Sequence, residues 1–124
     1  MAKVSEHDEQ CAVIQWAQLH ERKYPALSRL HAIPNGGKRN IVVAKKLKAE
    51  GVKAGVSDLC MTVPRGEYHG LYIEMKAIGG RLSDAQSEWI NRSKENDYAA
   101  FVCYGAKEAI EILEWYLKLP KYGG

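Results

Sequence analysis

Two short apolar runs joined by a turn-rich connection lie between residues 55 and 76, and they constrain the fold more than any other part of the sequence. Over residues 71–77, apolar side chains alternate with polar ones, so a β-strand would place Glu74 and Lys76 together on one face. The connection at residues 64–70 contains one proline and two glycines, which is typical of a hairpin. We therefore predict two neighbouring antiparallel strands in this segment.

This hairpin would bring two carboxylates together. Asp58 precedes the first run, and antiparallel pairing places it near Glu74. Two close carboxylates repel each other unless a cation lies between them or one of them binds a proton. Mg²⁺ prefers a few carboxylate oxygens together with water and a substrate phosphate, and Lys76 could orient a water or stabilise negative charge on that phosphate. On this spacing alone, however, a solvated strand face carrying a Glu and Lys ion pair is the simpler interpretation.

Length and composition limit the class of protein. A chain of 124 residues is long enough for one core but not for two, so we expect a single domain over residues 1–124. The fractions of hydrophobic residues (46%) and charged residues (27%) are normal for a globular protein. The formal net charge of +3 permits a nucleic-acid partner without requiring one, so the position of the charges matters more than their sum.

The cysteines and the chain termini indicate where the protein works. Three cysteines lie far apart in apolar segments, which predicts reduced, buried thiols rather than a disulfide framework or a zinc site: Cys11, Cys60 and Cys103. The N-terminal residues lack the apolar core of a signal peptide, and no apolar run approaches the ~20 residues that span a bilayer. We expect a cytoplasmic protein without a membrane segment.

The first helix carries an acidic residue on its apolar side. We predict this helix over residues 5–22, with Ser5 as its N-cap. Apolar residues between Val13 and His20 recur at three- and four-residue spacing, and one turn further back the same stripe reaches Glu9. Burying an unpaired carboxylate is costly, so Glu9 either faces a functional site or caps the first turn and points to water.

A glycine-rich loop and a basic helix follow. A short strand-like run within residues 27–33 leads to a Pro-Asn-Gly-Gly loop at residues 34–37, which either approaches a phosphate or is a flexible turn. A helix is predicted from about residue 40 to 50, closed by Gly51. Six of the 18 lysines and arginines lie between residues 38 and 53, which fits a phosphate-binding surface, although a solvated helix face looks similar. The predicted nucleic-acid contacts are Asn35, Gly36, Lys38, Arg39 and Lys45.

The remaining residues alternate between helices and strands. Ser83 and Gln86 have the spacing of a capping box that opens a helix to about residue 96, so Gln86 could simply bond the Ser83 amide. Residues 98–104 form an apolar run of strand length, which predicts burial on both faces. A last helix over residues 106–119 carries extra aromatic side chains that pack either on the sheet or in an oligomer contact. The strand after the capped helix returns parallel to an earlier one, which predicts an α/β fold with a mixed central sheet flanked by helices on both faces.

Four short motifs occur in a fixed order along the chain: Asn35-Gly36-Gly37, Gly55-Val56-Ser57-Asp58-Leu59, Tyr72-Ile73-Glu74-Met75-Lys76, and Leu82-Ser83-Asp84-Ala85-Gln86 followed by Trp89. Together they resemble the VRR-NUC (virus-type replication-repair nuclease) family of the PD-(D/E)XK nuclease superfamily. The resemblance extends from Glu9 to about Gly105 and implies a restriction-endonuclease-like fold. The superfamily often has proline before its first aspartate, whereas Ser57 stands in that place here, and serine can still begin the strand.

The resemblance implies a metal-dependent site. Asp58, Glu74 and the backbone carbonyl of Met75 would bind a catalytic Mg²⁺ or Mn²⁺, and Lys76 would orient or activate the attacking water. By the same resemblance, Glu9 supports the metal site from the first helix. Gln86 would help to position the lysine or the metal-bound water.

The family also implies a substrate. Its stand-alone viral members are dimers that cut branched DNA, such as four-way (Holliday) junctions. Because the chain shows no additional domain, we expect this stand-alone type: a homodimeric endonuclease acting on branched DNA and encoded by a phage or a bacterial prophage. Two alternatives are a nucleic-acid-binding module that keeps the fold without catalysis, and a structural or partner-binding domain that uses its aromatic last helix.

Overall fold

The computed structural model describes residues 4–34 and 40–123. Its helices and strands follow the predicted order, with one additional short 3₁₀ helix before the first strand. In chain order the elements are α1 (Glu6–His20), η1 (Pro25–Arg29), β1 (Leu30–Ala32), α2 (Ile41–Ala49), β2 (Leu59–Met61), β3 (Leu71–Lys76), α3 (Asp84–Glu95), β4 (Ala99–Tyr104) and α4 (Ala106–Leu117). Four of the predicted nucleic-acid contacts lie outside the described residues: Asn35, Gly36, Lys38 and Arg39.

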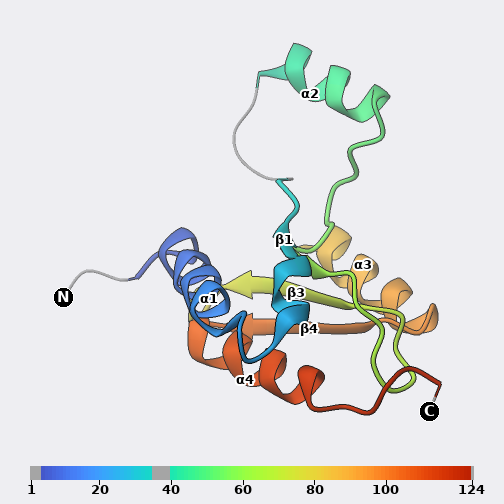
Figure 1. Cartoon of the computed structure of the whole chain (residues 1–124). Coiled ribbons are helices and arrows are strands. Elements are labelled where there is room, and N and C mark those ends of the chain that lie inside the picture. Colours follow the sequence, from blue (N-terminus) through green and yellow to red (C-terminus); the bar gives the residue numbers. More distant parts are fainter. Residues whose placement is uncertain (1–3, 35–39, 124) are drawn as a thin grey trace.

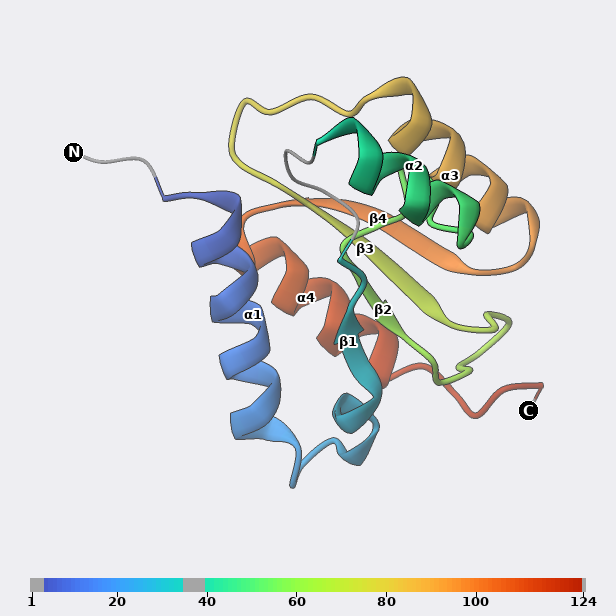
Figure 2. The same cartoon turned by 90° about the horizontal axis from the view of Figure 1, so that it is seen from above.

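The four strands form one mixed sheet whose spatial order is the chain order. β2 pairs antiparallel with β1 and with β3, whereas β4 pairs parallel with β3, as the sequence predicts. The register of the hairpin places Leu59 opposite Ile73 and Cys60 opposite Tyr72. Figure 1 shows α4 running along the sheet, and in the view from above α1 and α3 lie to either side of the strands (Figure 2). The predicted mixed sheet flanked by helices is confirmed.

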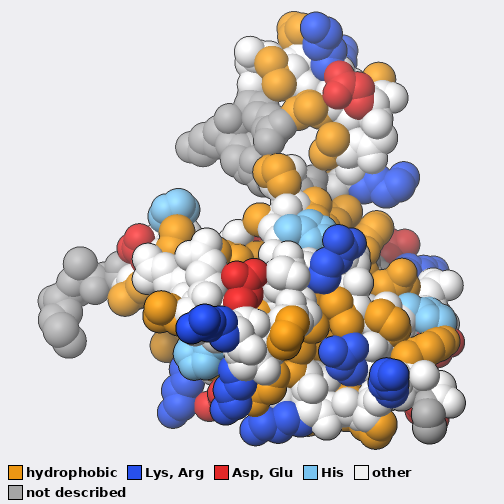
Figure 3. Space-filling model, viewed as in Figure 1, with side chains coloured by type: hydrophobic (Ala, Val, Ile, Leu, Met, Phe, Trp, Pro, Cys, Tyr) orange, Lys and Arg blue, Asp and Glu red, His pale blue; other side chains and the backbone are white. Residues whose placement is uncertain are grey.

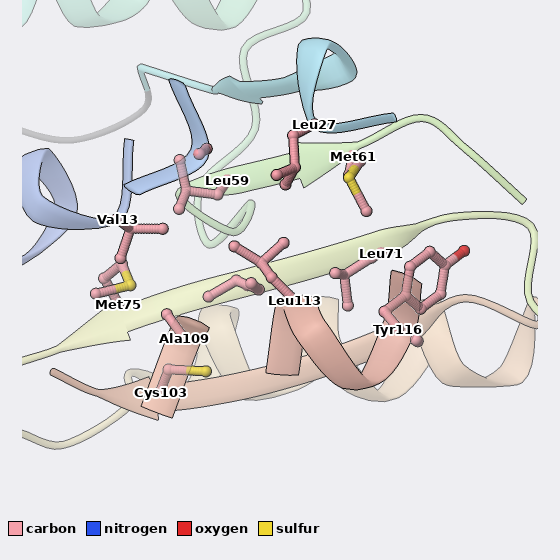
Figure 4. Packing of buried hydrophobic residues seen from close by; sticks show 13 residues of the cluster. Val13, Leu27, Leu59, Met61, Leu71, Met75, Cys103, Ala109, Leu113 and Tyr116 are labelled. Carbon is pink, nitrogen blue, oxygen red and sulfur yellow. The ribbon is translucent and has the colours of Figure 1, made fainter. Parts of the chain in front are cut away.

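The main core lies between one face of the sheet and two helices, α1 and α4. Alternate residues of β3, Leu71, Ile73 and Met75, point into it and are almost completely buried, as the period of two requires. Figure 4 shows side chains of α1 and α4 meeting them. The fully buried Tyr116 of α4 donates its hydroxyl hydrogen to the backbone oxygen of Val63 at 2.6 Å, so its polar end is also satisfied.

β4 is less buried than its composition suggests. Ala99, Ala100 and Cys103 are buried, but Phe101 and Val102 are only half-buried and Tyr104 is exposed. The prediction of burial on both faces is therefore wrong for three of the six residues of the strand. β4 is the last strand of the sheet, so no further strand covers its outer side.

The two aromatic residues near the end of α4 have different environments. Tyr116 packs on the sheet, whereas Trp115 is 39% exposed and lies edge-on to Phe101, with ring centroids 5.5 Å apart. Both aromatic residues therefore contact the sheet, but Trp115 covers only part of the edge strand β4 and stays partly exposed.

α2 stands apart from the rest of the fold. Asn40 caps it by accepting a hydrogen bond from the Val43 backbone amide at 2.9 Å, and Gly51 follows its end with a positive φ of +102°, as predicted. None of its nine described residues is buried, and Ile41 and Val42 are 72% and 65% exposed. Figure 1 shows the helix above the sheet, and Figure 3 shows hydrophobic and basic side chains together on its surface.

The cysteines are all free thiols, but they do not share one environment. Cys60 and Cys103 are buried, as predicted, and burial raises the pKa of both thiols. The prediction is wrong for Cys11, which is exposed on α1. Among residues 4–34 and 40–123, no helix combines the length and the apolar character needed to cross a bilayer.

At Gly55, the segment before Asp58 packs closely against the start of α3. A Cβ atom at this position would lie 2.4 Å from the carbonyl carbon and oxygen of Ala85, and the φ of +86° disfavours any L side chain. Gly79 offers a comparison, because its φ of +88° is almost the same but a Cβ atom there would have no neighbouring atom within 4 Å.

We expect Gly79→Ala to lower the free energy of unfolding by about 1 kcal/mol, through backbone strain alone. Gly55→Ala should lower it by about 3 kcal/mol, because the strain is the same and the backbone of Ala85 must also move. Denaturant titration of both variants measures the difference. Equal losses would show that the close approach to Ala85 contributes nothing to stability.

Candidate active site

The β2–β3 hairpin ends on the pair of carboxylates that the sequence predicts. Asp58 directly precedes β2, and its Oδ2 accepts a hydrogen bond from the backbone amide of Met75 at 2.7 Å. Its own backbone oxygen accepts from the amide of Ile33 at 2.8 Å. Asp58 is therefore held from both neighbouring strands, and the register places it at the level of Glu74.

Glu74 is buried although it lies on the face of β3 opposite the main core. Its side chain is 2% exposed, and its Oε1 is buried without a hydrogen-bond partner. Burial is the main cause that raises the pKa of Glu74 to about 9, and the neighbouring Asp58 carboxylate adds to it. The alternative of a solvated strand face is therefore wrong for Glu74.

This arrangement fits a divalent cation. A buried carboxyl beside a second carboxylate must bind either a proton or a cation, and Glu74 has one oxygen free to do so. No cluster of three or more His, Cys, Asp or Glu side chains that could hold a metal occurs in residues 4–34 and 40–123. The residues present thus offer two carboxylates, a set that suits Mg²⁺, which keeps several water ligands.

The backbone of Met75 faces the same place. Its amide donates to Asp58, and within a strand the N–H and C=O groups of one residue point to the same side. The paired residues of the hairpin end at Leu59 and Ile73, so Met75 lies beyond the last pair. A carbonyl ligand from Met75 remains a prediction that this geometry favours.

Gln86 performs the capping role and also reaches the carboxylates. Its Oε1 accepts from the Ser83 amide at 2.9 Å, and its own backbone amide donates to Ser83 Oγ at 3.1 Å, which completes the capping box. Because the cap occupies Oε1, the amide nitrogen Nε2 points away from the cap and donates to Glu74 Oε2 at 3.4 Å. The capping role is therefore confirmed, while the predicted positioning of the lysine or of a metal-bound water by Gln86 stays a prediction.

Lys76 lies on the same face of β3 as Glu74 and is half-buried. Its positive charge lowers the pKa of Glu74, against the larger opposing effect of burial. A Cβ atom on Gly80 would lie 3.6 Å from Cδ of Lys76, so the turn after β3 packs close to the aliphatic part of the lysine side chain. The structure thus brings together Asp58, Glu74 and Lys76.

Glu9 lies elsewhere. Its carboxylate accepts a hydrogen bond from the Ala106 backbone amide at the start of α4, so it satisfies a free N–H group of that helix. The alternative in which Glu9 caps its own helix and points to water is wrong. Its predicted support of a metal site stays a prediction, and no described contact joins it to Asp58 or Glu74.

Glu6 is the acidic residue of α1 that sequence reasoning missed. Its negative charge adds to the raised pKa of Glu74. Together with Gln10 and Ile14 it lines a groove of about 740 Å³ that also reaches Asp58. The signal was present in the sequence, because residues 6, 10 and 14 recur at a four-residue interval and mark a second stripe of the helix.

Lys45, the one predicted nucleic-acid contact among the described residues, lies away from Asp58 and Glu74. Lys45 is exposed on α2, together with Lys46 and Lys48. The lysine-rich helix α2 forms a separate projection above the sheet (Figure 3).

The raised pKa of Glu74 predicts how stability depends on pH. Near pH 4 this carboxyl is protonated in the folded and in the unfolded chain. As the pH rises towards 9 the unfolded chain gives up the proton first, so the metal-free protein loses stability over this range. We expect Glu74→Gln to remove this loss and to melt several degrees above wild type at pH 8 in chelator.

Thermal melts of both chains from pH 5 to 9, with chelator and with Mg²⁺, measure this effect. Mg²⁺ should stabilise the wild type most at alkaline pH and should leave Glu74→Gln nearly unchanged. Parallel pH profiles of the two chains would contradict the assignment of a buried, metal-binding Glu74.

Comparisons with known proteins agree with this geometry. The sequence model of the VRR-NUC domain matches residues 1–107. The chain is also similar to a solved structure described as a VRR_NUC domain protein, with a TM-score of 0.85 and 32% identity over 99% of this chain and 96% of that one. No curated protein matches the chain. Since the family match covers most of the residues and the fold agrees throughout, the chain belongs to the VRR-NUC domain family and has a nuclease-type fold.

Proposed function

We propose that this chain is a metal-dependent DNA endonuclease that hydrolyses phosphodiester bonds in branched DNA, such as Holliday junctions. The observation that carries the proposal is the buried Glu74 beside Asp58, with one carboxylate oxygen unpartnered and Lys76 on the same face. A protein that only binds DNA gains nothing from two acids close to a phosphate. A nuclease needs them to hold a metal.

Each residue has a specific task in this proposal. Asp58, Glu74 and the Met75 carbonyl would hold Mg²⁺ or Mn²⁺, and the metal would supply a Lewis acid that polarises the phosphoryl oxygen and makes water more acidic. Lys76 orients the attacking water and stabilises negative charge that develops on the phosphate. Gln86, fixed by its cap, keeps the Glu74 carboxylate in one orientation.

The basic helix α2 supplies the second half of the proposal. Lys45, Lys46 and Lys48 lie on a helix that has no buried residue among those described, so their ammonium groups can bind phosphates away from the reacting centre. Contacts of this kind hold DNA without reading its sequence. Recognition of structure rather than sequence follows from such a surface.

The proposal also covers the oligomeric state of the protein and the kind of cell in which it acts. Two phosphodiester bonds must be cut to resolve a four-way junction, and a homodimer with two-fold symmetry presents two equivalent sites to them. We therefore propose a homodimer that acts inside a bacterial cell, encoded by a phage or a prophage and serving DNA repair or recombination.

Cleavage of matched labelled substrates tests the activity. We expect the wild type to cut a four-way junction in Mg²⁺ or Mn²⁺ but not in chelator. Asp58→Asn, Glu74→Gln and Lys76→Met should each reduce the cleavage rate by at least about a hundredfold, because each removes a group that acts on the transition state. A flap, a plain duplex and a single strand serve as comparison substrates.

Glu111→Gln is the control, because Glu111 is an exposed carboxylate on α4 and its loss should leave cleavage unchanged. If the wild type binds the junction and cuts no substrate, the chain is a binding module and the proposed activity is wrong. If Glu74→Gln cuts normally, the residue assignment is wrong.

The contribution of α2 is measured by the salt dependence of binding. Replacing Lys45, Lys46 and Lys48 with alanine should weaken junction binding and reduce the slope of log K against log salt by about 0.9 for each lost phosphate contact. Stability should change little, because none of the described residues of α2 is buried. The control replaces three other lysines, Lys107, Lys118 and Lys121, and equal losses in the two triple variants would contradict a specific role of α2.

A further inference from the structure

A second cavity lies between β3 and α3, beside the carboxylates but distinct from them. It has a volume of about 330 Å³ and is lined by Tyr72, Trp89, Arg92, Ser93, Asn96 and Tyr98. Three of these six residues are aromatic. The rings form a connected set, with the Tyr72 centroid 5.8 Å from that of Trp89 and 5.4 Å from that of Tyr98.

This aromatic cavity continues the β3–α3 contact that forms the candidate active site. In the site Glu74 of β3 meets Gln86 of α3, and in the cavity Tyr72 meets Trp89. Tyr72 lies two residues before Glu74 on the same face of the strand, which corresponds to about 7 Å. Trp89 lies about one helical turn after Gln86 on α3. A strand whose phosphate reaches Glu74 therefore has a neighbouring nucleotide within reach of the cavity.

The charged side chains around the aromatic cavity favour binding of a neutral ring over binding of a phosphate. Arg92 is the only cationic side chain among the residues that line the cavity. Its guanidinium is already paired with Glu95 at 2.9 Å and lies 4.0 Å from Glu88, so little positive charge is left for an anion. Its planar group can still stack on a planar ring, and Asn96 adds an amide beside it.

The tryptophan also has an unused polar group. Trp89 Nε1 is buried without an acceptor in the part of the chain that the structure describes. Buried donors are normally paired, and exceptions gather where a protein binds something. Trp89 lines a further cavity as well, between the two chain segments that lead to and from α2 and include Pro34 and Lys53.

We propose that the aromatic cavity binds an unpaired nucleobase of the substrate, next to the phosphate that is cut. This inference rests on the proposed nuclease function and specifies its substrate. In a continuous duplex the bases remain stacked within the helix, whereas unpaired bases at a branch point can leave the stack at lower cost. Stacking of such a base on Tyr72 and Tyr98 would favour branched DNA over plain duplex without reading its sequence.

Photochemical crosslinking tests the contact without depending on activity. The full-length wild type, kept from cutting by chelator, is mixed with junctions that carry 5-iodouracil at each position around the cleavage site. We expect the nucleotide adjacent to the cut phosphate to crosslink to Tyr72, Trp89 or Tyr98. Crosslinks that map only to other residues, such as those of α1 or α2, would overturn the inference, and so would their absence from all three rings.

A cleavage assay with an abasic substrate gives a second, independent measurement. Removing the base at the same position should slow cleavage by the wild type between about fivefold and a hundredfold, the range expected for loss of one stacked base. Tyr98→Leu should reduce this difference between the two substrates, because one of the two rings that stack on the base is already gone. Trp115→Leu removes an aromatic ring of α4, outside this cavity, and should keep the full difference.

The outcomes separate this inference from the proposed function. If the wild type cuts the intact and the abasic junction at equal rates, the nuclease function holds and the base-binding cavity is wrong. If the chain neither cuts nor binds any DNA, both are wrong. If crosslinking maps to the three rings but no substrate is cut in metal, base binding holds while the catalytic proposal fails.

Discussion

The hydrogen bond from the Met75 amide to the Asp58 carboxylate fixes the geometry on which the rest of the site depends. The bond forms just beyond the last residue pair of β2 and β3. There the Met75 amide of β3 bonds the Asp58 side chain instead of a backbone carbonyl. Asp58 is thereby kept beside Glu74, and its charge is one reason why the pKa of Glu74 rises. This contact thus keeps two carboxyl groups side by side, and such a pair needs either a proton or a cation.

The site costs stability, and the opposite face of the sheet offsets that cost. Three buried side-chain atoms in the described residues have no hydrogen-bond partner: Ser57 Oγ, Glu74 Oε1 and Trp89 Nε1. All three belong to the segment before β2 or to the β3–α3 contact, whereas the other face of β3 contributes three almost fully buried apolar residues to the main core. Unsatisfied polar groups are expected at functional sites and rare elsewhere. The odd-numbered residues of β3 therefore pack in the main core, whereas Glu74 and Lys76 on its other face belong to the candidate site.

The sequence predicts whatever depends on neighbours along the chain, and fails where distant elements decide. The alternation in β3, the cap at Ser83 and the helix before Gly51 depend on local periodicity and turn chemistry, and the structure confirms each of them. Glu9 bonds the start of α4, 97 residues away along the chain. The apolar pattern of α1 shows that Glu9 lies on the buried side of the helix, but it cannot show which residue it contacts there. The exposure of β4 depends on its place at the edge of the sheet, which no apolar run can reveal. The composition of a strand therefore does not show whether other strands lie on both sides of it in the sheet.

The separation of α2 from the body divides the molecule into parts with different physical roles. Isolated helices shorter than about 12 residues are marginal in water, and α2 has nine residues with none of those described buried. Its helical state therefore depends on local features, namely the Asn40 cap and the positive φ of Gly51 just after its end. Changes in α2 should therefore have little effect on global unfolding, whereas changes at Asp58 or Glu74 act on the sheet itself. In the proposed nuclease, this separation would allow contacts of α2 with DNA to be released while Asp58 and Glu74 keep their positions on the sheet.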